Sequence, residues 1–447
     1  MRRILLFALL ALLTTVFVSG CTVGSATDLY RLPETAKDYV NLAARTEEVL
    51  ELGAEYCAPV KGSNRQSVQL VDLNGDGVDE AVAFFKIADD EKPLRVYIYR
   101  LLNGVYTTAM IIEAEGNAFD MIEYAQLDGS GYLELLIGTS INQDTPQVMS
   151  IFSINSFEPA LIGRSTYSAY TFCDVDTDGI AELITIMFSA QSETGVAYMH
   201  EYKSGSVEIT QEVRISANIE RLYSVRTGNL SDKVPAVFLT SVFKDGGWIT
   251  DIITVKRNRL SNITLNPALG YSSDTIVRSP IAIEDINSDG IMEVPRPASV
   301  SDVTEGSYVG NCYMVTWLSY SSIGRTKQAA VTFHNLSENW YVDMTGKWEE
   351  DILISHYNST YGIRCTTFYR RQDADEPAEF MRIYVLTGDN RYTRVNTTGS
   401  YLLKVQDVTV YAAKITDTQG LALEYAKEQL ALRFNLTRSE WYTGIIS

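Results

Sequence analysis

Apolar and polar residues alternate along most of this chain, in short runs that are separated by turn residues. Segments 94–100, 195–202 and 250–255 alternate with a period of two, which is typical of strands that bury one face of a sheet. Asn103-Gly104 follows the first of these segments, and this pair is a strong signal for a two-residue hairpin turn. The pattern predicts a mainly β protein with antiparallel sheets.

The two ends of the chain depart from this pattern. Residues 35–53 carry apolar side chains at helical spacing and predict an N-terminal helix. From about residue 341 we expect strands and then a helix at about 418–434, followed by a capping-box pattern at 437–440. The expected strands are 352–357, 362–370, 380–386, 402–405 and 408–412. This order predicts a small C-terminal α+β domain over residues 341–447.

A nine-residue segment recurs between the predicted strands. It reads DLNGDGVDE at 72–80, DVDTDGIAE at 174–182 and DINSDGIME at 285–293. Oxygen-bearing side chains at positions 1, 3, 5 and 9, with the backbone carbonyl at position 7, can surround one hard cation such as calcium. Glycine at position 6 permits the positive φ of a sharp turn. One such segment alone would be read as an ordinary turn, but three copies favour a metal loop.

The segment is not the loop of an EF-hand, which needs an acid at position 12. Position 12 is Ala83, Thr185 or Arg296, and predicted strands rather than helices follow the loops. Two weaker copies complete the series, which starts at residues 72, 126, 174, 229 and 285. The copy at 126 has Gln126 and Ser130 where acids are expected, so we expect metal there to be doubtful. The copy at 229 has Lys233 at position 5, and we expect no calcium there.

These loops and their spacing of about 50 residues resemble FG-GAP/VCBS-type repeats, the blades of integrin-α-like β-propellers. The resemblance implies a β-propeller over residues 61–340, with about three structural calcium ions in loops that join two strands of a blade. Pro295 and Pro297 predict that the fifth blade is irregular or presents an edge. The resemblance implies side-chain ligands Asp72, Asn74, Asp76, Glu80, Asp174, Asp176, Asp178, Glu182, Asp285, Asn287, Asp289 and Glu293. It implies carbonyl ligands from Val78, Ile180 and Ile291.

The N-terminus predicts the compartment. Met1-Arg2-Arg3 precedes an apolar run of 15 residues, which is short for a membrane-spanning helix but suits a signal peptide. Small residues and then Cys21 follow, and this sequence resembles the bacterial lipoprotein box. We therefore expect a signal peptide at 1–20, and a tether lipidated at Cys21 with the N-terminal helix at 21–60. Two or more acyl chains would anchor the protein on the extracytoplasmic face of the cell membrane. The alternative is an ordinary signal peptide.

The net charge bears on the kind of partner, and the cysteines bear on disulfide formation. The formal net charge of the 447 residues is −19, which makes a nucleic-acid partner unexpected, because phosphates need a basic surface. The other four cysteines are Cys57, Cys173, Cys312 and Cys365, and either disulfides or buried free thiols fit them.

No catalytic motif stands out in the sequence. Phosphate loops, Gly-x-Ser-x-Gly and His-Glu-x-x-His are absent, and we expect His200, His334 and His356 to be structural. The expected function is therefore that of a non-enzymatic binding module of the cell envelope, with a glycan or protein ligand. Two alternatives remain, namely a polysaccharide-degrading enzyme that uses an acid pair and a structural envelope assembly factor.

Overall fold

The computed structural model describes residues 37–437, except 143–145, 156–157, 304–307, 347, 350, 360, 372–375 and 419. Cys21 and the expected signal peptide lie outside the described residues, as do residues 438–440 of the expected capping box. Within the described part of the chain, no helix is both long and apolar enough to cross a membrane.

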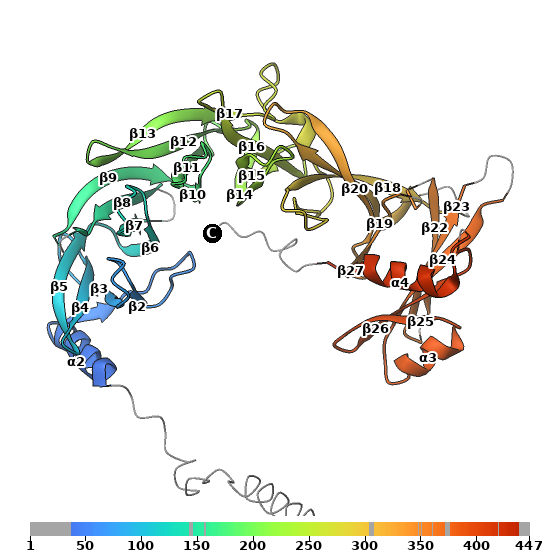
Figure 1. Ribbon diagram of the computed structural model, residues 1–447, viewed down its shortest axis with the longest axis horizontal. Coiled ribbons are helices and arrows are strands. Elements are labelled where there is room, and N and C mark those ends of the chain that lie inside the picture. Colours follow the sequence, from blue (N-terminus) through green and yellow to red (C-terminus); the bar gives the residue numbers. More distant parts are fainter. Residues whose placement is uncertain are drawn as a thin grey trace, which may run out of the picture.

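Six antiparallel sheets follow one another in chain order around an open arc, counted over the described residues (Figure 1). The first sheet contains β1 (Ala54–Tyr56), β2 (Val68–Val71), β3 (Glu80–Ile87), β4 (Leu94–Leu102) and β5 (Val105–Ala114). The second contains β6 (Ala118–Ala125), β7 (Glu134–Ser140), β8 (Gln147–Ser153) and β9 (Ala160–Tyr167). The third contains β10 (Ala169–Cys173), β11 (Glu182–Ser189), β12 (Thr194–Lys203) and β13 (Ser206–Arg214).

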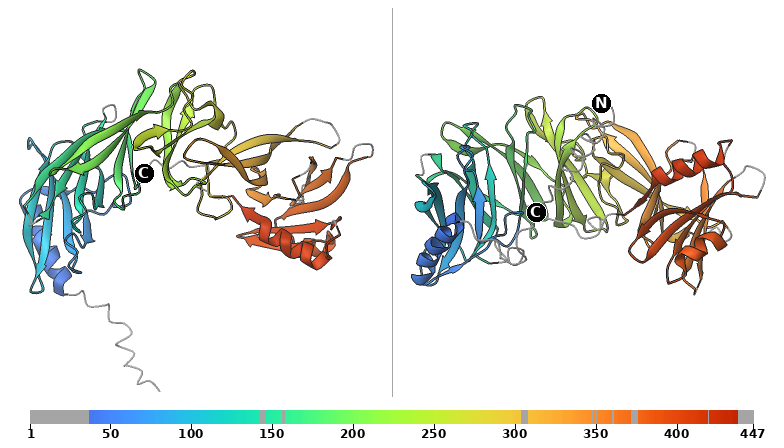
Figure 2. Two further views of the ribbon diagram at one scale, coloured as in Figure 1. Left: turned by 45° about the horizontal axis from the view of Figure 1, so that its top comes forward. Right: turned by 60° about the horizontal axis from the view of Figure 1, so that its bottom comes forward.

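The remaining three sheets continue the arc toward the red end of the chain, as Figure 2 shows from two further sides. The fourth contains β14 (Ile219–Asn229), β15 (Pro235–Phe243), β16 (Trp248–Lys256) and β17 (Arg259–Asn262). The fifth contains β18 (Glu293–Ser301), β19 (Tyr308–Tyr320), β20 (Thr326–Asn335), β21 (Trp340–Asp343) and β27 (Phe434–Leu436). The sixth contains β22 (Ile352–Ser359), β23 (Ile363–Arg370), β24 (Ala378–Leu386), β25 (Tyr401–Gln406) and β26 (Thr409–Ile415).

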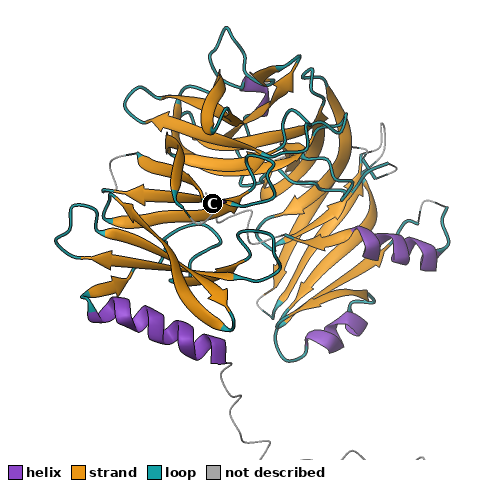
Figure 3. Ribbon diagram, turned by 60° about the vertical axis from the view of Figure 1, so that its left-hand side comes forward, coloured by secondary structure: helices purple, strands orange, loops and turns teal. Residues whose placement is uncertain are grey.

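Helices lie at the two ends of the arc (Figure 3). They are α2 (Lys37–Glu51), α3 (Arg391–Thr397) and α4 (Leu423–Arg433), and a 3₁₀ turn, η2 (Ser273–Thr275), follows the fourth sheet. Leu42 and Val49 of α2 pack on Ala83 and Phe85 of the first sheet, which confirms the predicted N-terminal helix. At the other end, Val395 of α3 packs against a buried cluster of the sixth sheet.

Short hairpins connect neighbouring strands within each sheet. β4 and β5 pair from Leu102 to Val105 around Asn103 and Gly104, whose φ angles are 55° and 75°. Two positive φ angles define the type I′ turn, which matches the twist of the flanking strands. The predicted hairpin is therefore confirmed.

The sheets stack through strands that are buried on both faces. Residues 80–85 of β3 are all buried, and so are residues 134–138 of β7 and 182–186 of β11. Separate buried clusters fill the spaces between successive sheets, and Phe84 against Phe119, with ring centroids 5.4 Å apart, is one such contact. The protein is thus mainly β, as predicted. Hydrogen-bonded pairing between the first and sixth sheets is absent from the described residues, so a closed ring is not shown.

The C-terminal strands share a core with the fifth sheet. β27 pairs with β21, so Trp340 lies opposite Leu436, and the expected domain boundary at 340/341 falls within β21. One buried cluster joins Phe333 of the fifth sheet to Phe368 of the sixth. β18 carries Pro295 and Pro297 and lies at one end of the strand order of the fifth sheet, and its pairing with β19 shifts register between Ser299 and Ser301.

The four cysteines of the described region are free thiols. Burial raises the pKa of both the Cys173 and the Cys312 thiol to about 12, so these two side chains are unreactive at neutral pH.

Candidate metal loops

The three acidic loops (72–80, 174–182 and 285–293) end at the first residues of β3, β11 and β18, and the first three residues of each strand are buried. In the first two, the glutamate at position 9 pairs in register with the residue just before position 1, as Glu80 does with Val71 and Glu182 with Cys173. In the third loop, Glu293 forms an antiparallel bridge with Glu284. The first two loops therefore join paired strands of a sheet, whereas the third leads from an isolated bridge at Glu284 into β18.

The aspartate at position 1 closes each loop by accepting backbone N–H groups from the turn. Asp72 accepts from Gly75, Asp76 and Gly77 at 2.8, 3.1 and 2.9 Å. Asp174 and Asp285 accept from positions 5 and 6 of their own loops at 2.9 to 3.1 Å. The glycines at position 6 have φ angles of 83°, 96° and 84°, so glycine is required there as predicted.

Positions 3 and 5 form a second set of hydrogen bonds, which recurs in all three loops. The side chain at position 3, Asn74, Asp176 or Asn287, accepts the N–H of position 5 at 2.8 to 3.1 Å. Asp76, Asp178 and Asp289 accept the N–H of position 7, from Val78, Ile180 and Ile291, at 2.8 to 2.9 Å. Each of these bonds occupies one side-chain oxygen. The predicted metal role of the carbonyls of Val78, Ile180 and Ile291 stays a prediction.

The glutamate at position 9 lies beneath each loop and is buried. Glu80, Glu182 and Glu293 are exposed by 1%, 5% and 0%, and one oxygen of each accepts the N–H of position 2 at 2.9 to 3.1 Å. The second oxygen of Glu293 is buried and has no hydrogen-bond partner among the described residues. A buried carboxylate oxygen without a partner is costly, and a cation in the loop would satisfy it.

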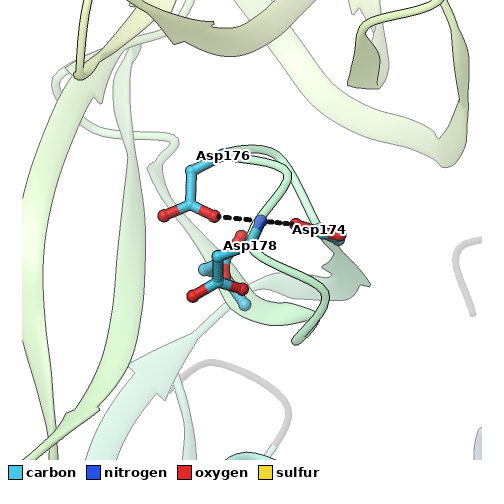
Figure 4. A group of neighbouring side chains, drawn as sticks. Asp174, Asp176 and Asp178 are labelled. Carbon is cyan, nitrogen blue, oxygen red and sulfur yellow. Dashed lines mark hydrogen bonds between the residues drawn. The ribbon is translucent and has the colours of Figure 1, made fainter.

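Loop 174–182 brings its acids closest together. One oxygen from each of Asp174, Asp176, Asp178 and Glu182 lies within 4.8 Å of the others, and Figure 4 shows the three aspartates around the backbone nitrogen of Asp178. Burial and the neighbouring Asp176 carboxylate raise the pKa of Glu182 to about 7. Burial and Asp178 also raise the pKa of Asp176. Oxygen ligands with this charge fit calcium, so the residues present fit the predicted ion.

The other two acidic loops share these features in part. Burial raises the pKa of Glu293 to about 7 and also raises the pKa of Glu80. The Asn74 amide donates to the second oxygen of Glu80 at 3.1 Å, and the Asn287 amide donates to Asp289 at 2.9 Å. Both asparagines therefore contact the acids with which they are predicted to share a cation.

The two weaker copies differ from each other. Loop 126–134 joins β6 to β7 in the same register, with Ala125 opposite Glu134. The copy at 229 is a tight turn between β14 and β15, in which the N–H of Leu230 donates to the carbonyl of Val234 at 2.9 Å. Lys233 in this turn is exposed, with a φ of 61°.

Loops of neighbouring sheets contact one another. The N–H of Leu133 donates to the carbonyl of Leu73 at 2.9 Å, which joins the loops of the first and second sheets. The side-chain amide of Asn229 donates to the carbonyl of Gly290 at 3.1 Å, which joins the fourth sheet to the third acidic loop. The loops therefore lie along the same rim of the stacked sheets.

A cavity of about 600 Å³ lies between loops 126–134 and 174–182. Tyr124 and Phe172 line it from β6 and β10, with Gln126, Gly129 and Ile180 from the loops. This cavity is not among the features that the sequence predicts. Its sequence signal is an aromatic residue two positions before a loop in two successive repeats.

Two of the histidines are buried in the sheets. His200 Nε2 lies 2.8 Å from the Thr185 hydroxyl, and burial lowers the pKa of His200 to about 4. His334 Nε2 lies 2.8 Å from the Thr332 hydroxyl, and burial lowers its pKa to about 3. Both are neutral at physiological pH.

Comparisons with known proteins assign no family to this chain. No family of known proteins and no curated protein sequence matches it. Among solved structures, a rhamnogalacturonan lyase is 10% identical over 73% of this chain and 74% of that chain, with a TM-score of 0.28. A GH43 β-1,3-galactosidase is 9% identical over 78% of this chain and 79% of that chain, with a TM-score of 0.29. Likenesses at this level do not support an inference about fold or activity.

Proposed function

We propose that this chain is a membrane-anchored, non-enzymatic binding module of the cell envelope, whose stacked sheets are stabilised by calcium in the three acidic loops. The observation that carries the proposal is a set of hydrogen bonds that recurs in all three loops, in which the side chains at positions 1, 3, 5 and 9 accept backbone N–H groups from the same loop positions. The lipid anchor at Cys21 and the extracytoplasmic location belong to this proposal and rest on the N-terminal sequence.

The arrangement of the sheets supports a β-propeller of the FG-GAP/VCBS type. Four-stranded sheets follow one another with consecutive strands as neighbours, and loops at the starts of successive sheets lie along one rim. This finer assignment is part of the proposal.

The loop acids explain why an ion would stabilise the fold. Without a cation, the carboxylates of Asp174, Asp176, Asp178 and Glu182 repel one another across less than 4.8 Å. Calcium, when bound, supplies the positive charge that offsets this repulsion. Asp174 accepts backbone N–H groups of the turn, and Glu182, the first residue of β11, accepts the N–H of Val175 at the other end of the loop. A stable loop therefore stabilises the pairing of β10 with β11.

The cavity between the second and third sheets is the proposed ligand site. Tyr124 and Phe172 offer aromatic faces, and Gln126 offers an amide that can form hydrogen bonds. Such a mixture suits a glycan or a peptide segment. Both flanking loops belong to the repeat series, so the metal state of the protein would affect the walls of the site.

The full chain, purified in detergent, provides the test. With calcium at about 10 mM and Kd values of roughly 10⁻⁴ to 10⁻³ M, each occupied loop adds about 1.4 to 2.7 kcal/mol to the free energy of unfolding. We expect a higher melting temperature in calcium than in chelator, and a smaller difference in Asp178→Ala. Glu212→Gln, an exposed change on the same sheet, is the matched control. Identical melting in calcium and chelator would remove the basis of the proposal.

Ligand binding requires a separate experiment. The full chain is immobilised, and envelope glycans and proteins are captured in calcium and in chelator. We expect calcium-dependent capture that is lost in the Tyr124→Ala/Phe172→Ala double variant. Turnover of a captured glycan by the wild-type protein would contradict the non-enzymatic role.

A further inference from the structure

A second cavity lies on the fifth sheet, beside the third acidic loop. Its volume is about 340 Å³, which falls within the range of roughly 300 to 1,000 Å³ that is usual for small-molecule pockets. Its walls come from segments that are distant in the sequence, namely residues 286–288 of the loop, Tyr341 and Asp343 of β21, and Arg433 and Asn435 at the junction of α4 with β27. β27 pairs with β21, beside which α4 also lies in Figure 1, and Asn435 is opposite Tyr341. The fold therefore assembles this cavity, because no single segment supplies its walls.

Tyr341 gives the cavity an aromatic wall. Its ring stacks on the imidazole of His334, with the ring centroids 5.0 Å apart and the ring planes 9° apart. His334 is fully buried in β20, so this stack holds the Tyr341 ring in a fixed orientation. Tyr341 itself is only half-buried and lines the cavity. A fixed aromatic ring at the side of a polar cavity offers an apolar surface for the C–H face of a sugar ring.

Arg433 and Asp343 bring opposite charges to the cavity without pairing with each other. Arg433 Nη1 donates to the carbonyls of Asp343 and Thr345 at 3.4 and 2.9 Å. The Arg433 guanidinium also lies over the Trp348 ring, 5.5 Å from its centroid. One oxygen of the Asp343 carboxylate accepts the N–H of Thr345 at 2.8 Å. Neither charged group forms an ion pair within the part of the chain that the structure describes. The guanidinium retains further N–H donors and the carboxylate a second oxygen, so both groups can bind a ligand.

We propose that this cavity binds a neutral sugar residue of a glycan. Sugar hydroxyl groups both donate and accept hydrogen bonds, so the Arg433 guanidinium serves as donor to one hydroxyl and the Asp343 carboxylate as acceptor from another. The Asn435 amide nitrogen donates to the Arg433 carbonyl at 3.3 Å, which leaves the amide oxygen as a further acceptor. One positive and one negative group offset each other, so the cavity favours a ligand without net charge.

A zwitterion such as an amino acid is the competing ligand for this pair of charges. It would use the guanidinium and the carboxylate but has no need of the Tyr341 ring or the Asn435 amide. The combination of an aromatic wall with several hydrogen-bonding groups therefore favours a sugar. The site goes beyond the proposed function, because it lies on the fifth sheet and depends neither on calcium nor on the cavity between the second and third sheets.

Saturation-transfer NMR on the full chain in detergent tests the site. The probes are D-galactose, D-mannose and N-acetyl-D-glucosamine, with L-serine as the zwitterion. All variants carry Tyr124→Ala/Phe172→Ala, which removes the aromatic walls of the other cavity. Asp343→Asn removes a charge and keeps an oxygen for the nearby backbone N–H, and Asn435→Ala is the second test. Asp389→Asn, an exposed change before α3, is the matched control.

We expect at least one of the sugars to bind in this background, with an affinity that Asp343→Asn lowers roughly tenfold or more and Asp389→Asn leaves unchanged. Asn435→Ala should also weaken binding, and it decides the question if Asp343→Asn melts at a lower temperature than the control. Absence of sugar binding, equal binding in both test variants and the control, or binding of L-serine alone overturns the inference. The proposed function is judged separately, because calcium-dependent melting does not require this cavity.

Discussion

Replacing Glu182 by glutamine should have opposite effects on the protein with and without calcium. Glutamine keeps the shape of the side chain and can still accept the N–H of Val175, but it carries no charge. In chelator, the variant should therefore be more stable than wild type at alkaline pH. In calcium, it should lose a ligand and gain less stability than wild type does.

The magnitude follows from the pKa of Glu182. This pKa is 4.5 in the unfolded chain and about 7 in the folded, calcium-free protein. The folded state thus binds the proton more tightly, so the stabilising contribution is complete below pH 4.5 and is lost as the pH rises through 7. A pKa difference of this size corresponds to at most about 3 kcal/mol, because one pKa unit corresponds to 1.36 kcal/mol. The pKa of Glu293 is also about 7, so its stabilising contribution is lost over the same pH range. Glu182→Gln leaves this contribution of Glu293 unchanged.

The assay is unfolding in chelator at pH 5 and pH 8, followed by circular dichroism and by hydrogen exchange in β11. Wild type should be less stable at pH 8 than at pH 5, and Glu182→Gln should lose roughly half of that difference. Glu212→Gln, exposed on β13 of the same sheet, should behave as wild type. A full pH dependence in Glu182→Gln, or calcium stabilisation equal to that of wild type, would contradict this role of the Glu182 carboxylate.

Three further predictions address the core, a buried charge and the anchor. Phe238→Ala should destabilise the protein by about 3 to 5 kcal/mol in urea unfolding, since Phe238 is fully buried between the fourth and fifth sheets; a loss below about 1 kcal/mol would contradict that packing. Asp251→Ala should lower the free energy of unfolding by about 3 kcal/mol or more. The buried Asp251 carboxylate accepts hydrogen bonds from Ser216, Asn262 and Ser272 at 2.6 to 2.8 Å, and its removal leaves those donors unpaired. Protease resistance of residues 263–281 is the second readout, and wild-type resistance would count against this role. Cys21→Ala should move the protein from the membrane fraction to the soluble fraction, and unchanged membrane association would exclude acylation at Cys21 as the anchor.

The local features of this fold were predictable because they depend on neighbouring residues. The spacing of Asp174, Asp176 and Asp178 predicts the turn that the structure contains, and Asn103-Gly104 predicts its hairpin. Features that join distant segments could not be predicted in this way. Nothing near Leu436 indicates that it lies opposite Trp340, and no acidic loop marks the sixth sheet.

The same limit applies to the candidate sites. The cavity on the fifth sheet depends on the pairing of β27 with β21, which brings Asn435 opposite Tyr341. The cavity between the second and third sheets depends on Tyr124 and Phe172 being brought together by two strands about 50 residues apart. Three-dimensional packing, not the spacing of residues, decides both.

The packing of α2 on the first sheet has a mechanical consequence. A pulling force between the N-terminal end of α2 and β6 passes through the contact of α2 with the first sheet and then through the apolar interface between the first and second sheets. Arg45 and Asn41 of α2 each form one hydrogen bond with the backbone of Tyr106 in the first sheet. The later sheets lie outside this path. The described hydrogen bonds between α2 and the first sheet are fewer than those that pair β3 with β4, so α2 would detach before any sheet is torn apart. Detachment of α2 would then release the force before the sheets of the arc unfold.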